Sequence, residues 1–124
     1  FPGGWPDDNT NAFTGEGLTD QQKEAQAYMK KLANWRKNKT VVHNGEMKHY
    51  LPKESVYVYF RYNDKESVMV VLNNSKENKT IKGNRFAESL KGFTSGTDIV
   101  SGKSIASLAS LEVAAGSAMI IELK

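Results

Sequence analysis

The spacing of the apolar residues changes near residue 40, and this change limits what the chain can fold into. Between residues 19 and 38 the apolar positions recur every three or four residues, which is the spacing of an amphipathic helix. From residue 40 onward, short segments with an alternating pattern are separated by turn-forming residues, which is typical of strands. The sequence predicts a loop over residues 1–18, one helix, and then an all-β domain.

The predicted helix over residues 19–38 has a defined start. Thr19 and Gln22 have the spacing of a capping box, in which each side chain bonds to the backbone N–H of the other residue. One apolar stripe follows at helical spacing: Ala25, Tyr28, Met29, Leu32 and Trp35. Because an isolated helix of this length is only marginally stable in water, the stripe requires a covering surface.

The segment after the helix contains many short candidate strands. They lie at 40–43, 46–51, 56–62, 67–73, 79–82, 97–100, 104–107, 110–113 and 118–123, with one helical turn at 85–90. Asn44-Gly45 is a hairpin-type turn signal between the first two. Many short strands with turns between them indicate a sandwich or a barrel. We expect a mainly β fold, an antiparallel Greek-key β-sandwich of about eight strands.

The two faces of the candidate strand 56–62 differ in character. Val56, Val58 and Phe60 share one face with Tyr62, and this face is the expected core, paired with Val68, Val70 and Leu72 of the next strand. Tyr57, Tyr59 and Arg61 share the other face, which combines large apolar bodies with polar tips. That second face is interpreted either as a platform that stacks on sugar or as an interdomain surface, and the interdomain surface is favoured.

Composition excludes several classes of function. The 124 residues are fewer than the about 250 that a (β/α)8 barrel needs. The chain has no cysteine, which excludes disulfides, thiol catalysis and cysteine-based zinc sites but leaves the compartment open. No apolar run approaches the roughly 18 residues of a membrane span. The net charge of +3 is spread along the chain, so nucleic acid is not an expected partner.

Groups that carry out chemistry are sparse. The only histidines, His43 and His49, are expected to be ordinary strand residues. Glycoside hydrolysis needs two carboxylates in different environments, and no Asp or Glu occupies an apolar strand end that would raise its pKa. The sequence therefore predicts no catalytic residue, no cofactor and no metal site in this chain. Glycosylation sequons at Asn38, Asn73 and Asn78 are interpreted as chance matches.

Several segments together resemble one region of the alpha-amylase superfamily, glycoside hydrolase family thirteen. The chain begins Phe-Pro-Gly-Gly-Trp-Pro-Asp, with Asn-Ala-Phe at 11–13. The predicted helix ends Leu-Ala-Asn-Trp-Arg-Lys at 32–37, and residues 38–45 are similar to the stretch that opens the family's C-terminal domain. Residues 57–61 and 71–74 resemble its central hairpin. Within the family, the cyclomaltodextrinase and neopullulanase group is the most similar.

This resemblance implies a division of the chain and a larger parent enzyme. Residues 1–38 would be the end of the catalytic barrel, namely a loop and the last helix, and residues 39–124 the C-terminal β-sandwich. The start at Phe1, without Met, suggests a piece of a longer bacterial polypeptide. The parent would cleave α-glucosidic bonds with retention, using carboxylates upstream of Phe1. The expected partners are that barrel and, through it, an α-glucan substrate.

Candidate binding residues follow from the resemblance and from the aromatic pattern. In the parent, Trp5, Asp7 and Phe13 are candidates for sugar contact, because loops after barrel strands border the active site. The predicted interdomain surface comprises Tyr28, Leu32, Trp35, Tyr57, Tyr59 and Arg61. The alternative is a carbohydrate-binding module that stacks glucan on exposed aromatic rings.

Overall fold

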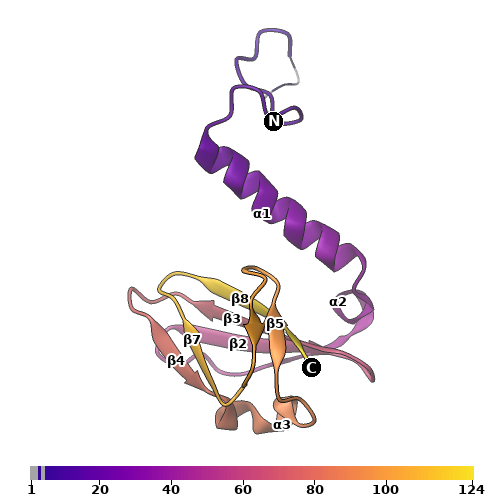
Figure 1. The fold of residues 1–124 in the computed structure, drawn as a ribbon, viewed down its shortest axis with the longest axis vertical. Coiled ribbons are helices and arrows are strands. Elements are labelled where there is room, and N and C mark those ends of the chain that lie inside the picture. Colours follow the sequence, from indigo (N-terminus) through magenta and orange to yellow (C-terminus); the bar gives the residue numbers. More distant parts are fainter. Residues whose placement is uncertain (1–2, 4) are drawn as a thin grey trace. The chain divides into compact units, whose positions relative to one another are not determined.

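The computed structural model describes residue 3 and residues 5–124, and these form two compact units (Figure 1). Unit 1 is Phe1–Lys37 and unit 2 is Asn38–Lys124. Part of the family-like opening segment, namely Phe1, Pro2 and Gly4, lies outside the described residues.

Unit 1 consists of a loop and the helix α1 (Asp20–Lys37). The predicted capping box is present: the Thr19 N–H donates to Gln22 Oε1 at 2.9 Å, and the Gln22 N–H donates to Thr19 Oγ1 at 3.2 Å. Gln26 Nε2 donates to the Ala12 carbonyl at 2.9 Å, which joins the loop to the first turns of the helix. The start of α1 is therefore fixed by side chains that the sequence alone identifies.

Unit 2 is an antiparallel β-sandwich. Its strands are β1 (Glu46–His49), β2 (Val56–Tyr62), β3 (Ser67–Asn73), β4 (Lys79–Lys82), β5 (Gly96–Asp98), β6 (Ser104–Ile105), β7 (Ser110–Val113) and β8 (Ala118–Leu123). The first sheet has the order β1-β2-β3-β8-β5-β6, and β4 pairs with β7 in a second sheet. Short helices are α2 (Thr40–Asn44), η1 (Gly83–Phe86) and α3 (Ala87–Leu90). The predicted mainly β fold of about eight strands after one helix is confirmed.

The prediction of a first strand at 40–43 is wrong, because this segment forms the helix α2. Asn44-Gly45 consequently does not make a hairpin. Gly45 instead ends the helix by donating its N–H to the Val41 carbonyl at 3.0 Å. Val41 is fully buried. Burial of this side chain against the sheet outweighs the low helix propensity of adjacent β-branched residues.

The core lies between the two sheets, and its pairing differs from the prediction. Val58 pairs with Val71, and Phe60 pairs with Met69, so Val68, Val70 and Leu72 lie on the outer face of the six-stranded sheet. Strand β3 is apolar on both faces, so alternation could not identify the inner one. The four-residue turn between β2 and β3 sets the register by placing Tyr62 opposite Ser67.

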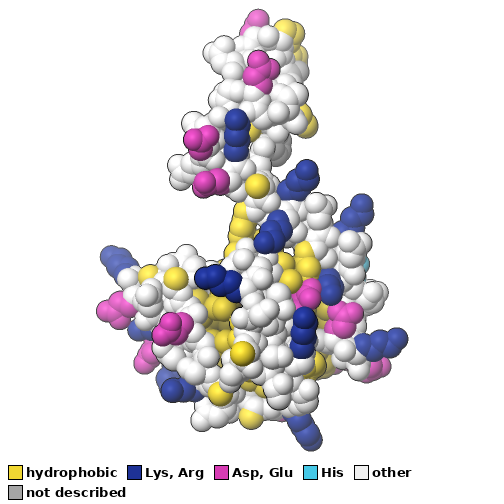
Figure 2. Space-filling view, in the orientation of Figure 1, with side chains coloured by type: hydrophobic (Ala, Val, Ile, Leu, Met, Phe, Trp, Pro, Cys, Tyr) yellow, Lys and Arg dark blue, Asp and Glu magenta, His cyan; other side chains and the backbone are white. Residues whose placement is uncertain are grey.

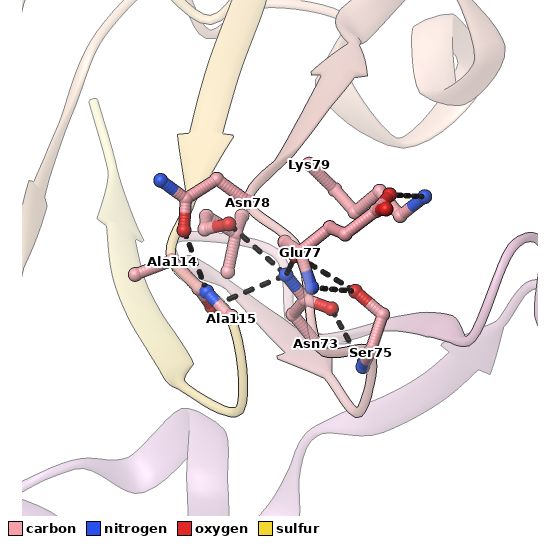
Figure 3. Close-up of polar contacts among 8 residues, drawn as sticks. Asn73, Ser75, Glu77, Asn78, Lys79, Ala114 and Ala115 are labelled. Carbon is pink, nitrogen blue, oxygen red and sulfur yellow. Dashed lines mark hydrogen bonds and ion pairs between the residues drawn. The ribbon is translucent and has the colours of Figure 1, made fainter.

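A buried asparagine links the two sheets (Figure 3). Asn73, 3% exposed at the end of β3, donates from Nδ2 to the carbonyls of Val113 and Ala114 after β7, at 3.0 and 3.1 Å, and to that of Glu77 at 3.0 Å. Its Oδ1 accepts the Ser75 N–H at 2.9 Å. The side chain thus meets the hydrogen-bonding needs of two loops, and Asn73 is not available for glycosylation in the folded chain.

The turn before β2 is strained. Glu54 and Ser55 have φ of 53° and 66°, the conformation of a two-residue hairpin turn that normally requires Asn or Gly. The turn is closed by paired hydrogen bonds between Lys53 and Val56, at 2.9 and 3.0 Å. No glycine marks this turn, so the sequence does not reveal it.

Replacing Ser55 with glycine is expected to stabilise unit 2 by about 1 kcal/mol, because glycine adopts positive φ without steric cost. Urea unfolding followed by the β-sheet circular dichroism signal would measure the change. Ala115→Gly is a control for loss of a side chain in another turn, since Ala115 is exposed and does not have a positive φ. An unchanged or lower midpoint for Ser55→Gly would show that the conformation is not costly.

Candidate functional site

The opening loop displays two large aromatic side chains. Trp5 is 78% exposed and Phe13 is 77% exposed, and Asp7 is also exposed. The neighbouring Asp8 and Asn11 shape the loop. Asp8 Oδ2 accepts the N–H groups of Gly3 and Trp5 at 2.7 and 3.1 Å. Both N–H groups precede Asp8 in the sequence, so its carboxylate bonds back to the first residues of the loop.

Asn11 performs the same task for the second aromatic residue. Its Oδ1 accepts the N–H groups of Phe13 and Thr14 at 2.9 and 3.1 Å. These bonds direct the Asn11 oxygen to the loop backbone. The described residues include no group of three or more His, Asp or Glu side chains placed to hold a metal ion.

The outer face of the six-stranded sheet carries the predicted tyrosine pair. The Tyr57 and Tyr59 ring centroids are 5.6 Å apart with planes inclined by 39°, and His49 lies 6.2 Å from the Tyr57 ring. Across the ladder lie Val70 and Leu72, of which Leu72 is 40% exposed. Both tyrosines are half-buried. The face therefore combines apolar side chains with two tyrosine rings that also carry hydroxyl groups.

Arg61 shares this face in sequence but has a different task. Its Nη2 donates to the Val42 carbonyl of α2 at 2.7 Å. Lys39, just before α2, forms ion pairs with Glu122 of β8 at 3.0 Å and with Glu66 at 3.7 Å. Together with buried Val41, these residues hold the start of unit 2 on its own sheet. We call Lys39, Val41, Arg61, Glu66 and Glu122 the junction clamp.

The hydrogen bond from Lys39 to Glu122 raises the pKa of the Lys39 ammonium above its ordinary value of 10.5, and partial burial opposes the shift. Stabilisation by Lys39 is therefore expected to be complete below pH 10.5 and lost as the pH rises through the higher folded-state pKa. Lys39→Met should remove this pH-dependent part, about 1 kcal/mol. Urea unfolding at neutral pH and above the lysine pKa would measure it. The expectation would be contradicted if the free energy of unfolding changed equally with pH in the wild type, in Lys39→Met and in the exposed control Lys103→Met.

Positively and negatively charged side chains are interspersed on the face of unit 2 seen in Figure 2. None of the described helices has the length and apolar character needed to cross a membrane. The hollows of unit 2 include one of about 410 Å³ beside β4 and one of about 260 Å³ beside β2 and α3.

The sequence of the sandwich matches a known family. Residues 47–122 fit the profile described as the Cyclo-malto-dextrinase C-terminal domain. The chain belongs to this family. The cyclo-malto-dextrinase C-terminal domain thus begins in β1 and ends in β8, and the resemblance to the C-terminal region of alpha-amylase-superfamily enzymes is confirmed.

Solved structures share the fold of this domain, and their similarity also covers residues outside it. AmyP in complex with maltose aligns over 87% of the chain at 18% identity, with a TM-score of 0.72. An Anoxybacillus alpha-amylase aligns over 95% at 20% identity and a TM-score of 0.70. Trehalulose synthase MutB of Pseudomonas mesoacidophila aligns over 97% at 20% identity and a TM-score of 0.62.

The chain spans about a quarter of these neighbours. It covers 22% of AmyP, 25% of the Anoxybacillus enzyme and 24% of MutB. The cyclo-malto-dextrinase C-terminal domain described here is therefore similar to one part of each larger polypeptide, and its similarity extends beyond the residues 47–122 matched by the family profile.

Proposed function

We propose that this chain is the C-terminal end of an α-glucan hydrolase of the cyclomaltodextrinase type. Residues 1–38 would contribute the loop and last helix of its catalytic barrel, and residues 39–124 would support that barrel. The family match and the quarter-length alignments support the proposal. The parent would hydrolyse α-glucosidic bonds with retention, through an Asp nucleophile and a Glu acid/base that precede Phe1.

The observation that carries this proposal is the junction clamp. A free-standing binding module needs no rigid attachment of the chain that enters it. Here Lys39 pairs with two strand-end carboxylates, and Arg61 holds the α2 backbone. Such anchoring holds the first residues of unit 2 on its own sheet, which is what a supporting domain requires of the segment that leads into it.

The remaining predicted residues fit this assignment as follows. Trp5, Asp7 and Phe13 would contact sugar from the barrel side, because the loop displays them to solvent. Tyr28, Leu32 and Trp35 of α1 would pack on the barrel. Tyr57 and Tyr59 would face the same barrel across the outer sheet surface.

A second candidate function is glucan binding by Tyr57 and Tyr59, favoured by their half-exposed, adjacent rings. Stacking on a sugar chain works best on nearly coplanar rings. The inclination of 39° between these two planes is less suited to that task than to an irregular protein surface.

The upstream coding sequence tests the main proposal. We expect an open reading frame that continues before Phe1 and encodes a (β/α)8 barrel with acidic residues at strand ends. The complete polypeptide should release maltose from cyclodextrin, whereas the 124-residue chain should release none above a buffer blank. Maltose release by the short chain, or a frame without a barrel, would overturn the proposal.

Replacing Tyr57 and Tyr59 together with serine is expected to destabilise the chain by about 2 kcal/mol, since each ring is half-buried. Calorimetry with maltoheptaose should detect no binding before or after the change. Tyr62→Ser, on the opposite face of β2, is the matched control. If the double variant melts like wild type but loses measurable maltoheptaose binding, the outer face is a sugar platform and not an interface.

A further inference from the structure

The larger hollow of unit 2 is strongly basic. It lies between β4 and the turn before β2, with a volume of about 410 Å³. Four cationic side chains line it: Lys53, Lys79, Lys82 and Arg85. The only carboxylate among its lining residues is that of Glu54. The excess of positive charge around this one hollow equals the +3 net charge of the entire chain.

Among these four cations only Lys79 forms an ion pair within the described residues, so three are left without a protein counterion. Lys79 pairs with Glu77 at 3.6 Å, and Arg85 donates to the Leu51 carbonyl while its guanidinium lies 5.3 Å from the Phe86 ring centroid. Within the described part of the chain, neither Lys53 nor Lys82 forms an ion pair. Like charges that converge without partners repel one another, so an anion among them would relieve that repulsion.

The backbone fixes the positions from which these side chains extend. Lys82 belongs to β4 and pairs with Ser110 of β7. Lys53 opens the strained turn at Glu54 and Ser55, whose Ser55 carbonyl also accepts the Asn74 N–H at 2.9 Å. Positive φ at two consecutive residues other than glycine is uncommon and tends to occur at functional sites. This strained turn places Lys53 and Glu54 among the residues that line the hollow.

We propose that this hollow binds a phosphate group, either as inorganic phosphate or as a phosphate monoester carried on a sugar. A multiply charged oxyanion suits a site in which cations outnumber carboxylates four to one. Arg85 offers a planar set of donors, the lysines offer point charges, and Thr80 and Asn84 add neutral donors at the lining. The volume exceeds what phosphate alone fills, which leaves room for the group that carries it. The inference does not depend on the proposed hydrolase.

Nuclear magnetic resonance of the 15N-labelled 124-residue chain tests the inference. The chain would be titrated with inorganic phosphate, glucose 6-phosphate and maltose, all at one fixed ionic strength. We expect saturable shifts of amides at 53–56 and 79–86 with both phosphates and no such shifts with maltose. Tighter binding of glucose 6-phosphate than of inorganic phosphate would identify the ester as the ligand, and the reverse order would identify the free ion.

Charge-removing variants complete the test. Lys53→Gln with Lys82→Gln should weaken phosphate binding about tenfold, because two charge-assisted contacts are lost. Lys103→Gln removes the same type of charge from an exposed turn that does not line the hollow, and it should leave binding unchanged. Both changes are at exposed positions, and the spectra themselves report whether the fold is kept. The inference would be overturned if the amide shifts did not saturate, or if Lys103→Gln weakened phosphate binding as much as the double variant does. The lysines would then serve to protect an exposed sheet edge from pairing with another chain.

Discussion

Replacing Asn73 with alanine is expected to lower the free energy of unfolding of unit 2 by about 3 kcal/mol. The asparagine side chain donates to three carbonyl groups and accepts one N–H, and it is almost completely buried. Alanine would leave those backbone groups without a partner in a place that water cannot easily reach. A buried polar group without a partner costs more than an ordinary hydrogen bond contributes, so the loss is large.

Equilibrium urea unfolding followed by far-ultraviolet circular dichroism would measure this loss. Tryptophan fluorescence is unsuitable, because Trp5 and Trp35 both belong to unit 1. Asn78→Ala is the matched control, since exposed Asn78 makes one bond, to the Ala115 N–H at 3.0 Å, and should cost less than about 1 kcal/mol.

A second variant, Asn73→Asp, distinguishes the contribution of side-chain shape to stability from that of hydrogen bonding. Asn73→Asp keeps the size of the side chain but turns its donor group into an oxygen that faces carbonyl oxygens. We expect it to be at least as destabilising as Asn73→Ala at neutral pH. A stable aspartate variant would show that filling space, and not hydrogen bonding, is what this position requires.

The strands were predictable where their two faces have different characters or their ends carry turn residues. β2, β3, β4, β7 and β8 occur at the predicted positions. The pairing of β2 with β3 was not predictable, since Val68, Met69, Val70 and Val71 are all apolar and either face would satisfy the pattern. The helix α2 was missed for a related reason. Its β-branched residues favour a strand locally, and only burial of Val41 by residues distant in sequence makes the helix stable.

The candidate site likewise has features that could be predicted from the sequence and features that could not. The two faces of β2 could be predicted because side chains alternate along a strand, and Tyr57 and Tyr59 do lie together on the outer face. The junction clamp could not, since Lys39 and Glu122 are at opposite ends of the sandwich sequence and meet only through the order of the sheet. The basic hollow was likewise not predictable, because its cationic side chains come from a turn, a strand and a 3-10 helix that folding brings together.

Gly45 is the position where the chain passes from α2 into the sandwich, and it allows the importance of that junction to be measured. Its φ of −71° is accessible to any residue, so backbone freedom does not explain the glycine. Space does. A Cβ atom at this position would overlap the Val41 carbonyl oxygen and would lie 2.9 Å from the Tyr62 carbonyl oxygen. Any side chain must therefore push α2 away from β2.

Gly45→Ala is expected to destabilise unit 2 by about 3 kcal/mol, at the upper end of the cost of overpacking, because the conflict is with backbone atoms of two elements. Gly102→Ala provides the opposite case, since Gly102 has φ of 75° but no atom near its Cβ position. That variant should cost only the strain of a left-handed conformation, about 1 kcal/mol. Urea unfolding compares the two, and amide exchange of α2 and β2 locates the damage. If Gly45→Ala costs no more than Gly102→Ala, α2 is free to move on the sheet and the junction clamp does not fix the path of the chain.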